Sequence, residues 1–242
     1  MSDTLTIGLV LPDVLGTYGD DGNALVLRQR ARMRGIEAEI LPIHFGEPVP
    51  DSLDLYTLGG GEDTAQMIAV KHLRADGGLG RAAAKGTPII AICAGLQVLG
   101  TDFRASGGQV AGLGLIDATT VSLKKRTIGE LAATPMIPEL TQPLTGFENH
   151  MGATRLGGDA SPLGRVTRGV GNTDEEGDKY LGCDGVVQGS IIATYMHGPA
   201  LARNPELADL LLARALGTTL AELPALDLPE VTALRAERLG TK

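Results

Sequence analysis

The sequence contains no tryptophan, and aromatic residues make up only 3% of its 242 residues. A platform that stacks nucleic-acid bases needs exposed aromatic rings, so none is expected here. Excess positive charge is lacking as well, because 21 Lys and Arg stand against 29 Asp and Glu, for a net charge of −8. Both deficits argue against a nucleic acid as the partner.

Long apolar runs are also missing. No stretch approaches the roughly 18 residues of a transmembrane helix, and the N-terminus has neither the basic region nor the cleavage site of a signal peptide. We therefore expect no direct membrane insertion. Cysteine occurs only at positions 93 and 183, which is typical of a reduced, cytoplasmic chain. Scattered histidines and two cysteines form no zinc pattern, so no metal site is predicted.

Short apolar runs alternate with helical stretches in the first half of the chain. Strands are predicted at 5–11, 38–43, 53–58 and 88–92, and helices at 24–33, 63–73 and 80–85. The run at 88–92 has no polar face, which is typical of a strand covered on both sides. This alternation predicts an α/β fold whose central, mostly parallel sheet is flanked by helices.

The second half has a different character. Between residues 107 and 189 turns are frequent, and short strands are predicted at 115–121, 144–149 and 164–170. An added region of short strands is therefore expected beside the sheet. The pattern then returns to an apolar strand at 190–195 and a helix at 204–216. No linker divides the chain, so we interpret residues 1–217 as one domain and 218–242 as its C-terminal helical appendage.

The most informative segment is the change from the apolar run 88–92 to Cys93, Ala94 and Gly95. A buried strand that ends at a cysteine and passes directly into a helix is the pattern of a nucleophile elbow. The helix N-terminus favours a thiolate and offers N–H groups to an oxyanion. Burial of a small cysteine is the alternative interpretation, but the abrupt change favours a nucleophile. Cys183 has no such frame and is interpreted as incidental.

A cysteine nucleophile needs a base, and the chain has four histidines. His197 ends the apolar strand at 190–195 and so lies at the sheet edge that also presents Cys93, the edge where open α/β sheets place their chemistry. His150 is the competing candidate. The position at the strand end favours His197.

Three segments carry a resemblance to a known family. The elbow at Cys93, the turn Gly59–Asp63 and GSIIATYMHG at 189–198 resemble the class I glutamine amidotransferases, and GFENHMG at 146–152 is similar to their cobyric-acid-synthase-like branch. The resemblance covers roughly residues 5–216. It implies a flavodoxin-like class I glutamine amidotransferase fold, with residues 1–217 as that domain.

Two further segments, YGDDGN at 18–23 and HGP at 197–199 with the following Asn204-Pro205, resemble the glutaminase subunits of lipid II isoglutaminyl synthases. That resemblance implies a subunit that hydrolyses L-glutamine and passes ammonia to a Mur-ligase-like, ATP-dependent partner in a heterodimer. The partner would amidate the D-glutamate of lipid II to D-isoglutamine during peptidoglycan synthesis. No cofactor is expected in this chain, since ATP and Mg would belong to the partner.

The resemblance also assigns roles to residues. It makes Cys93 the nucleophile that forms a γ-glutamyl thioester and His197 the group that takes the thiol proton and returns it to the leaving ammonia. The N–H groups of Ala94 and Gly60 would form the oxyanion hole. Arg126 matches the position that orients glutamine, although by itself it is interpreted as part of a solvated basic patch.

One position departs from the family pattern. Class I enzymes usually carry Glu two residues after the histidine, and this chain has Pro199 there. A dyad, a carboxylate from elsewhere in the chain, or a carboxylate from the partner would each explain the substitution. Supply by the partner is the favoured hypothesis, and it predicts slow hydrolysis by the isolated chain.

Two other functions are weighed against a glutaminase subunit. An amidotransferase for a cobalamin precursor would normally carry an ATP-binding domain ahead of this one, and the sequence has no G-x-x-x-x-G-K-[ST] loop. A catalytically idle module that senses glutamine is favoured by Pro199 and opposed by the intact elbow at Cys93.

Overall fold

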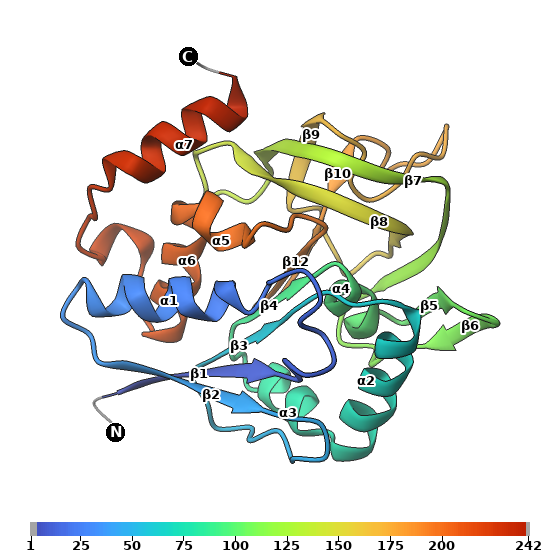
Figure 1. Ribbon diagram of the computed structural model, residues 1–242, viewed down its shortest axis with the longest axis horizontal. Coiled ribbons are helices and arrows are strands. Elements are labelled where there is room, and N and C mark those ends of the chain that lie inside the picture. The colour runs from blue at the N-terminus through green and yellow to red at the C-terminus, as the bar shows by residue number, and fades with distance from the viewer. Residues whose placement is uncertain (1–3, 241–242) are drawn as a thin grey trace.

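The computed structural model of the protein describes residues 4–240, and within them two sheets are packed with helices (Figure 1). The first sheet has the strand order β11-β12-β4-β3-β1-β2. Its strands are β1 (Leu5–Val10), β2 (Ala38–Ile43), β3 (Leu55–Leu58), β4 (Ile89–Ile92), β11 (Val186–Gln188) and β12 (Ile191–Thr194). All neighbours pair in parallel except β11, which is antiparallel to β12. The predicted α/β class with a mostly parallel central sheet is confirmed.

Helices cover both faces of this sheet, as a fully apolar central strand requires. On one face lie α1 (Gly22–Arg32), α5 (Ala200–Arg203) and α6 (Pro205–Ala215), and on the other α2 (Asp63–Asp76), α3 (Gly78–Ala84) and α4 (Ala94–Leu99) (Figure 1). A short 3₁₀ turn, η1 (Leu220–Glu222), precedes α7 (Pro229–Leu239). Helix α7 is fixed by buried Arg235, whose guanidinium donates to the carbonyl oxygens of Arg203 and Pro143.

The second sheet lies beside the first and contains the predicted β-rich region. Its strands are β5 (Asp102–Ala105), β6 (Gly108–Ala111), β7 (Ala118–Pro135), β8 (Leu144–Leu156), β9 (Gly164–Arg168) and β10 (Cys183–Asp184). Strands β7 and β8 are longer than the short strands expected, with 18 and 13 residues. The pairing of β7 with β8 shifts register between Ser122 and Thr127. Such an irregularity breaks the alternation of apolar residues that reveals a long strand in sequence.

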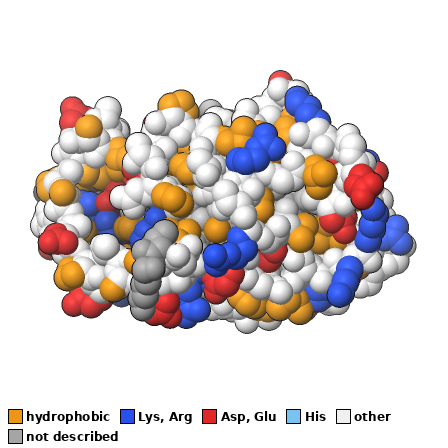
Figure 2. Space-filling view, turned by 90° about the horizontal axis from the view of Figure 1, so that it is seen from above, with side chains coloured by type: hydrophobic (Ala, Val, Ile, Leu, Met, Phe, Trp, Pro, Cys, Tyr) orange, Lys and Arg blue, Asp and Glu red, His pale blue; other side chains and the backbone are white. Residues whose placement is uncertain are grey.

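The surface agrees with the acidic, mixed charge of the sequence. On the face shown in Figure 2, Lys and Arg side chains are interspersed with Asp and Glu, and apolar atoms form separate patches. Within residues 4–240 there is no helix with the length and apolar character needed to cross a bilayer.

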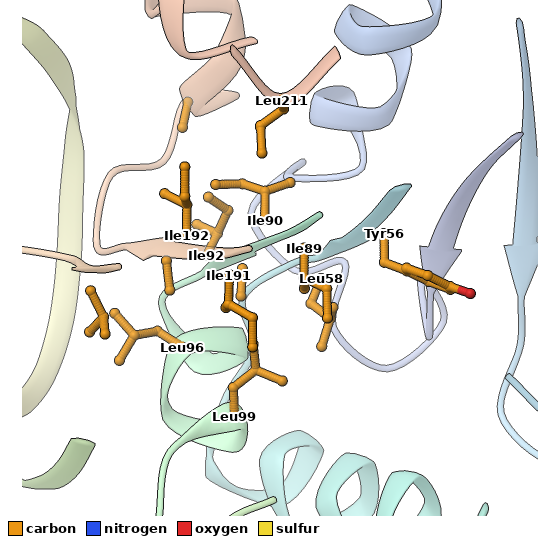
Figure 3. Packing of buried hydrophobic residues seen from close by; sticks show 14 of the residues in the cluster. Tyr56, Leu58, Ile89, Ile90, Ile92, Leu96, Leu99, Ile191, Ile192 and Leu211 are labelled. Atoms are coloured by element: carbon orange, nitrogen blue, oxygen red, sulfur yellow. The ribbon is translucent and has the colours of Figure 1, made fainter. Parts of the chain in front are cut away.

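The core of the first sheet is built from isoleucines of β4 and β12. Figure 3 shows Ile90 and Ile192 on the side of Leu211 from α6, while Ile191 points toward Leu99 of α4. All of these except Ile191 are fully buried, and Ile191 is 4% exposed. Burial of each such side chain contributes about 1.5–3 kcal/mol. Since Cys93 follows β4 and His197 follows β12, this packing fixes both strand ends.

We expect Ile90→Ala to lower the free energy of unfolding by about 2–5 kcal/mol, because it removes buried methyl groups and leaves a cavity. Ile128→Ala is the control, since Ile128 is 63% exposed and its truncation should change stability by less than about 0.5 kcal/mol. Urea denaturation of the three proteins measures both effects. Equal losses in the two variants would contradict the proposed role of the β4 core.

Candidate active site

Cys93 occupies a strained turn between β4 and α4. Its backbone has φ 52° and ψ −104°, and within residues 4–240 only Leu11 shares a positive φ among residues other than glycine. A non-glycine residue held in such a conformation costs of order 1–3 kcal/mol. The Cys93 N–H donates to the carbonyl oxygen of Thr194 in β12 at 2.9 Å, so the neighbouring strand holds the turn. The predicted elbow geometry is present.

Small residues allow α4 to approach the sheet this closely. A Cβ added at Gly95 would lie 3.1 Å from both the carbonyl oxygen of Gly59 and the Cβ of Leu58. A side chain at this position would push the helix away from β3. Gly95 therefore allows α4 to pack closely against β3, in addition to the chemical role expected of Cys93.

His197 follows β12 and is held in place by its backbone. Its N–H donates to the carbonyl oxygen of Phe147 at 2.8 Å, and its own carbonyl accepts from the Phe147 N–H at 3.1 Å. These two bonds attach the end of β12 to β8 in the second sheet. The imidazole is buried, with only 3% of the residue exposed, and the ring of Tyr18 packs against it with centroids 4.8 Å apart.

A carboxylate from this same chain contacts His197. Asp20 places Oδ2 at 2.9 Å and Oδ1 at 3.1 Å from His197 Nδ1, and the residue is 2% exposed. The expectation that the partner supplies this group is therefore wrong, and the explanation that a carboxylate comes from elsewhere in the chain is the correct one. Pro199 stands where the family usually has its acid, two residues after the histidine, and the loop between β1 and α1 provides Asp20 instead.

The β1–α1 loop reaches the site because several backbone contacts fix its path. Leu11, at its start, donates its N–H to Ile43 at 2.8 Å, and its carbonyl accepts from Val14 and Leu15. At its end, the side-chain oxygen of Asn23 accepts the N–H of Leu201 at 2.9 Å, which joins α1 to the segment after His197. The sequence analysis noted the segment that contains Asp20, YGDDGN at 18–23, but the residues alone did not show its role.

The electrostatics favour the protonated form of His197. Burial works against the imidazolium, but the hydrogen bond to Asp20 and the neighbouring Cys93 raise the pKa of His197 to about 10. Nδ1 is engaged by Asp20, while Nε2 is buried and has no hydrogen-bond partner among residues 4–240. Nε2 is therefore the ring nitrogen that remains available to another group.

Cys93 lies in a polar cavity of about 290 Å³. Arg126 lines the same cavity, and its Nη1 donates to Asn149 Oδ1 at 2.9 Å. The structure thus brings Arg126 to Cys93, although 33 positions separate them in sequence. Other lining residues that matter below are Tyr18, Gly61, Glu62, Asp63, Gln66, Gln97, Arg104 and His150.

Gly60 lies against His197 and Asp20. Its N–H donates to Asp20 Oδ2 at 3.0 Å, and a Cβ here would lie 2.9 Å from His197 Cε1. The glycine is therefore needed for space, and its N–H orients Asp20. The Gly60 N–H is thus engaged by Asp20, and Gly61 is the residue of this turn that lines the cavity with Cys93.

His150, the competing base, also lines the cavity but has a different environment. Its ring stacks on Tyr195 with centroids 3.7 Å apart, and Nδ1 bonds the carbonyl oxygen of Gly152 at 2.9 Å. Glu148 Oε2 is 3.5 Å from Nε2, beyond a good hydrogen bond. Burial lowers the pKa of His150. The carboxylate-oriented histidine is therefore His197.

Comparison with known proteins agrees with this geometry. Residues 6–205 match the model of the CobB/CobQ-like glutamine amidotransferase domain. This chain belongs to that family. It is 37% identical over 214 residues to the lipid II isoglutaminyl synthase (glutamine-hydrolyzing) subunit GatD of Staphylococcus aureus, with 87% of this chain and 84% of that protein covered. The GatD subunit of Streptococcus pneumoniae is 34% identical, over 88% of this chain and 80% of that protein.

More distant similarities extend the picture. The cobyric acid synthase of Sphingopyxis alaskensis is 30% identical over 73% of this chain, but the match spans only 34% of that longer protein. A crystal structure of a glutamine amidotransferase superposes with a TM-score of 0.55 at 20% identity, covering 86% of this chain and 98% of that one. The glutaminase domain of a Trypanosoma brucei CTPS gives a TM-score of 0.53 at 11% identity, covering 88% and 94%. These two structures show that the fold is shared.

Asp20→Asn should keep the fold but lower kcat for glutamine hydrolysis by about 10⁴, as loss of the orienting carboxylate does in a serine protease triad. The neutral amide cannot stabilise the imidazolium and favours the wrong tautomer. Asp21→Asn is the matched control, because Asp21 is adjacent in sequence and, within residues 4–240, it is Asp20 and not Asp21 that bonds His197. Ammonia release by the isolated chain measures the effect, and a similar loss in both variants would contradict it.

The raised pKa of His197 also predicts a pH dependence of stability. Since the folded-state value of about 10 exceeds the ordinary 6.5, protonation of His197 stabilises the fold fully below about pH 6.5, and this contribution is lost as the pH rises through about 10. The wild type should therefore lose stability relative to His197→Gln over that range.

Urea unfolding at successive pH values measures this difference in free energy. His150→Gln is the control, because burial lowers the pKa of His150, and a lowered pKa cannot produce a loss of stability between pH 6.5 and about 10. A wild-type advantage over His197→Gln that stays constant with pH would exclude the linkage.

Proposed function

We propose that this protein is the glutaminase subunit of a lipid II isoglutaminyl synthase. The observation that carries the proposal is the contact of Asp20 with His197, in a site that also holds Cys93 and within a family that hydrolyses glutamine. The similarity to two GatD subunits supports the specific reaction, since the match spans most of both proteins. The match to cobyric acid synthase covers a third of that protein, which favours the GatD-like assignment.

The chemistry begins with the Cys93 thiolate. The sulfur attacks the carboxamide carbon of L-glutamine, while the N–H groups of Ala94 and Gly61 stabilise the negative charge on the carbonyl oxygen. His197 then donates its Nε2 proton to the leaving nitrogen, which departs as ammonia and leaves a γ-glutamyl thioester. A water molecule, deprotonated by His197, hydrolyses the thioester to glutamate. Asp20 keeps the imidazole oriented through both steps.

Ammonia is the useful product of this chain. We infer that it passes to a Mur-ligase-like partner in a heterodimer, where ATP with Mg²⁺ activates the D-glutamate carboxylate of lipid II for amidation. This chain would need no cofactor of its own. Because the orienting carboxylate is within the chain, glutamine hydrolysis does not require the partner, in contrast to the expectation drawn from Pro199.

A diazoketone analogue of glutamine tests the nucleophile. We expect one covalent adduct on the isolated chain by intact mass, abolished in Cys93→Ala and retained in Cys183→Ala. Both cysteines are buried, so the comparison separates a reactive site from simple thiol exposure. An adduct that persists in Cys93→Ala, or no adduct on the wild type, would contradict the assignment.

The partner and the final product need a separate experiment. The chain is mixed with a Mur-ligase-like ATP-dependent protein, lipid II, ATP, Mg²⁺ and L-glutamine, and amidated lipid II is measured by mass spectrometry. Amidation is expected with wild type and not with Cys93→Ala unless free ammonia is added. Glutamine hydrolysis without any amidation would support a glutaminase and reject the proposed acceptor.

A further inference from the structure

Gln66, in the first turns of α2, is a cavity residue that the steps above do not use. It lines the cavity together with Cys93 and Gln97, and only 5% of the residue is exposed. Its Nε2 donates to Gln97 Oε1 at 2.6 Å, while its Oε1 has no hydrogen-bond partner among residues 4–240. A buried acceptor without a partner destabilises the free protein, and a ligand that donates a hydrogen bond to it would remove this cost.

A chain of hydrogen bonds leads from the Gln66 amide into the core. Gln97 Nε2 donates to the hydroxyl of Tyr195 at 3.1 Å, and Gln97 Oε1 accepts from Gln66 Nε2. The Tyr195 hydroxyl shares a further bond with Thr154 at 2.6 Å, and burial raises the pKa of Tyr195, which keeps the hydroxyl protonated. Gln66 is thereby held with its donor engaged and its acceptor available.

The charges around the cavity indicate which part of glutamine this acceptor meets. The start of α2 also contributes Glu62 and Asp63 to the cavity, so this wall carries acceptors. The second sheet contributes Arg104 and Arg126, and within residues 4–240 neither guanidinium forms an ion pair with a carboxylate. Glutamine is a zwitterion, and electrostatic complementarity directs its α-carboxylate to the arginines and its α-ammonium to the α2 wall.

We propose that Gln66 is a specificity-determining residue whose Oε1 accepts a hydrogen bond from the α-ammonium of L-glutamine. This inference rests on the proposed glutaminase function. The residues at the start of α2 would then distinguish an amino acid from a carboxamide that has no α-ammonium group. A site built to bond a charged donor discriminates strongly against an analogue that lacks it.

The test compares L-glutamine with glutaramate, which has the same carboxamide and carboxylate but no α-ammonium. For Gln66→Met we expect kcat/KM for glutamine to fall by about 10- to 100-fold, the size of a lost hydrogen bond to a charged group. The value for glutaramate should stay within about threefold, because that substrate never makes the bond. Ammonia release by the full chain is measured for both substrates.

Two further variants isolate the hydrogen bond. Gln66→Glu keeps an acceptor oxygen and should retain the preference for glutamine over glutaramate. Gln29→Met makes the same replacement as Gln66→Met on the exposed side of α1 and should change neither value. Equal losses for both substrates in Gln66→Met would assign Gln66 a purely structural role and overturn the inference.

The wild-type measurements keep the two proposals distinguishable. If wild type releases ammonia from glutamine but shows no preference over glutaramate, the α-ammonium is not recognised and the inference fails while the proposed function stands. If wild type hydrolyses neither substrate, the proposed function fails, and the inference fails with it.

Discussion

The site depends on one buried hydrogen bond, between Asp20 and His197 Nδ1. It orients the imidazole, raises the pKa of His197 and leaves Nε2 for Cys93. The bond is possible only because Gly60 has no side chain, since a Cβ there would meet both His197 and Asp20 within 3.1 Å. The Gly60 N–H then donates to the same carboxylate. Gly60 therefore provides the space for the His197 ring, while Asp20 determines the orientation of that ring and raises its pKa.

The parallel sheet explains how four distant segments reach that point. Cys93 follows β4 and His197 follows β12, while Asp20 and Gly60 lie in the loops after β1 and β3. Parallel strands present their carboxyl ends at one edge, so loops that follow them meet there. The second sheet adds Arg126 from β7 and holds His197 through the backbone of Phe147 in β8. The cavity that contains Cys93 and Arg126 lies where residues from both sheets meet.

Placement of the acid in the β1–α1 loop, and not two residues after the histidine, changes what the fold must maintain. Pro199 now takes the place of the acid, and its ring fills the space beside Gly22, where an added Cβ would lie 2.2 Å from Pro199 Cγ. The start of α1 and the segment after His197 are thereby packed together, and the bond between Asn23 and Leu201 secures them. The loop that carries Asp20 is held at the site from both of its ends.

The sequence by itself determined the parallel α/β fold, because buried strands and amphipathic helices have local, periodic signatures. It also predicted a nucleophile at Cys93, because an apolar strand that passes directly through a cysteine into a helix is a local pattern as well. His197 could also be predicted from the sequence, since the carboxyl ends of parallel strands lie at the same edge of the sheet. The tertiary structure alone decided the partner of His197, because Asp20 is 177 positions away and nothing in the spacing distinguishes it from Asp21. The tertiary structure also decided that the Gly60 N–H donates to Asp20 and that β7 continues through its bulge as one long strand. Hydrogen-bond partners across a fold depend on distances that no local sequence pattern encodes.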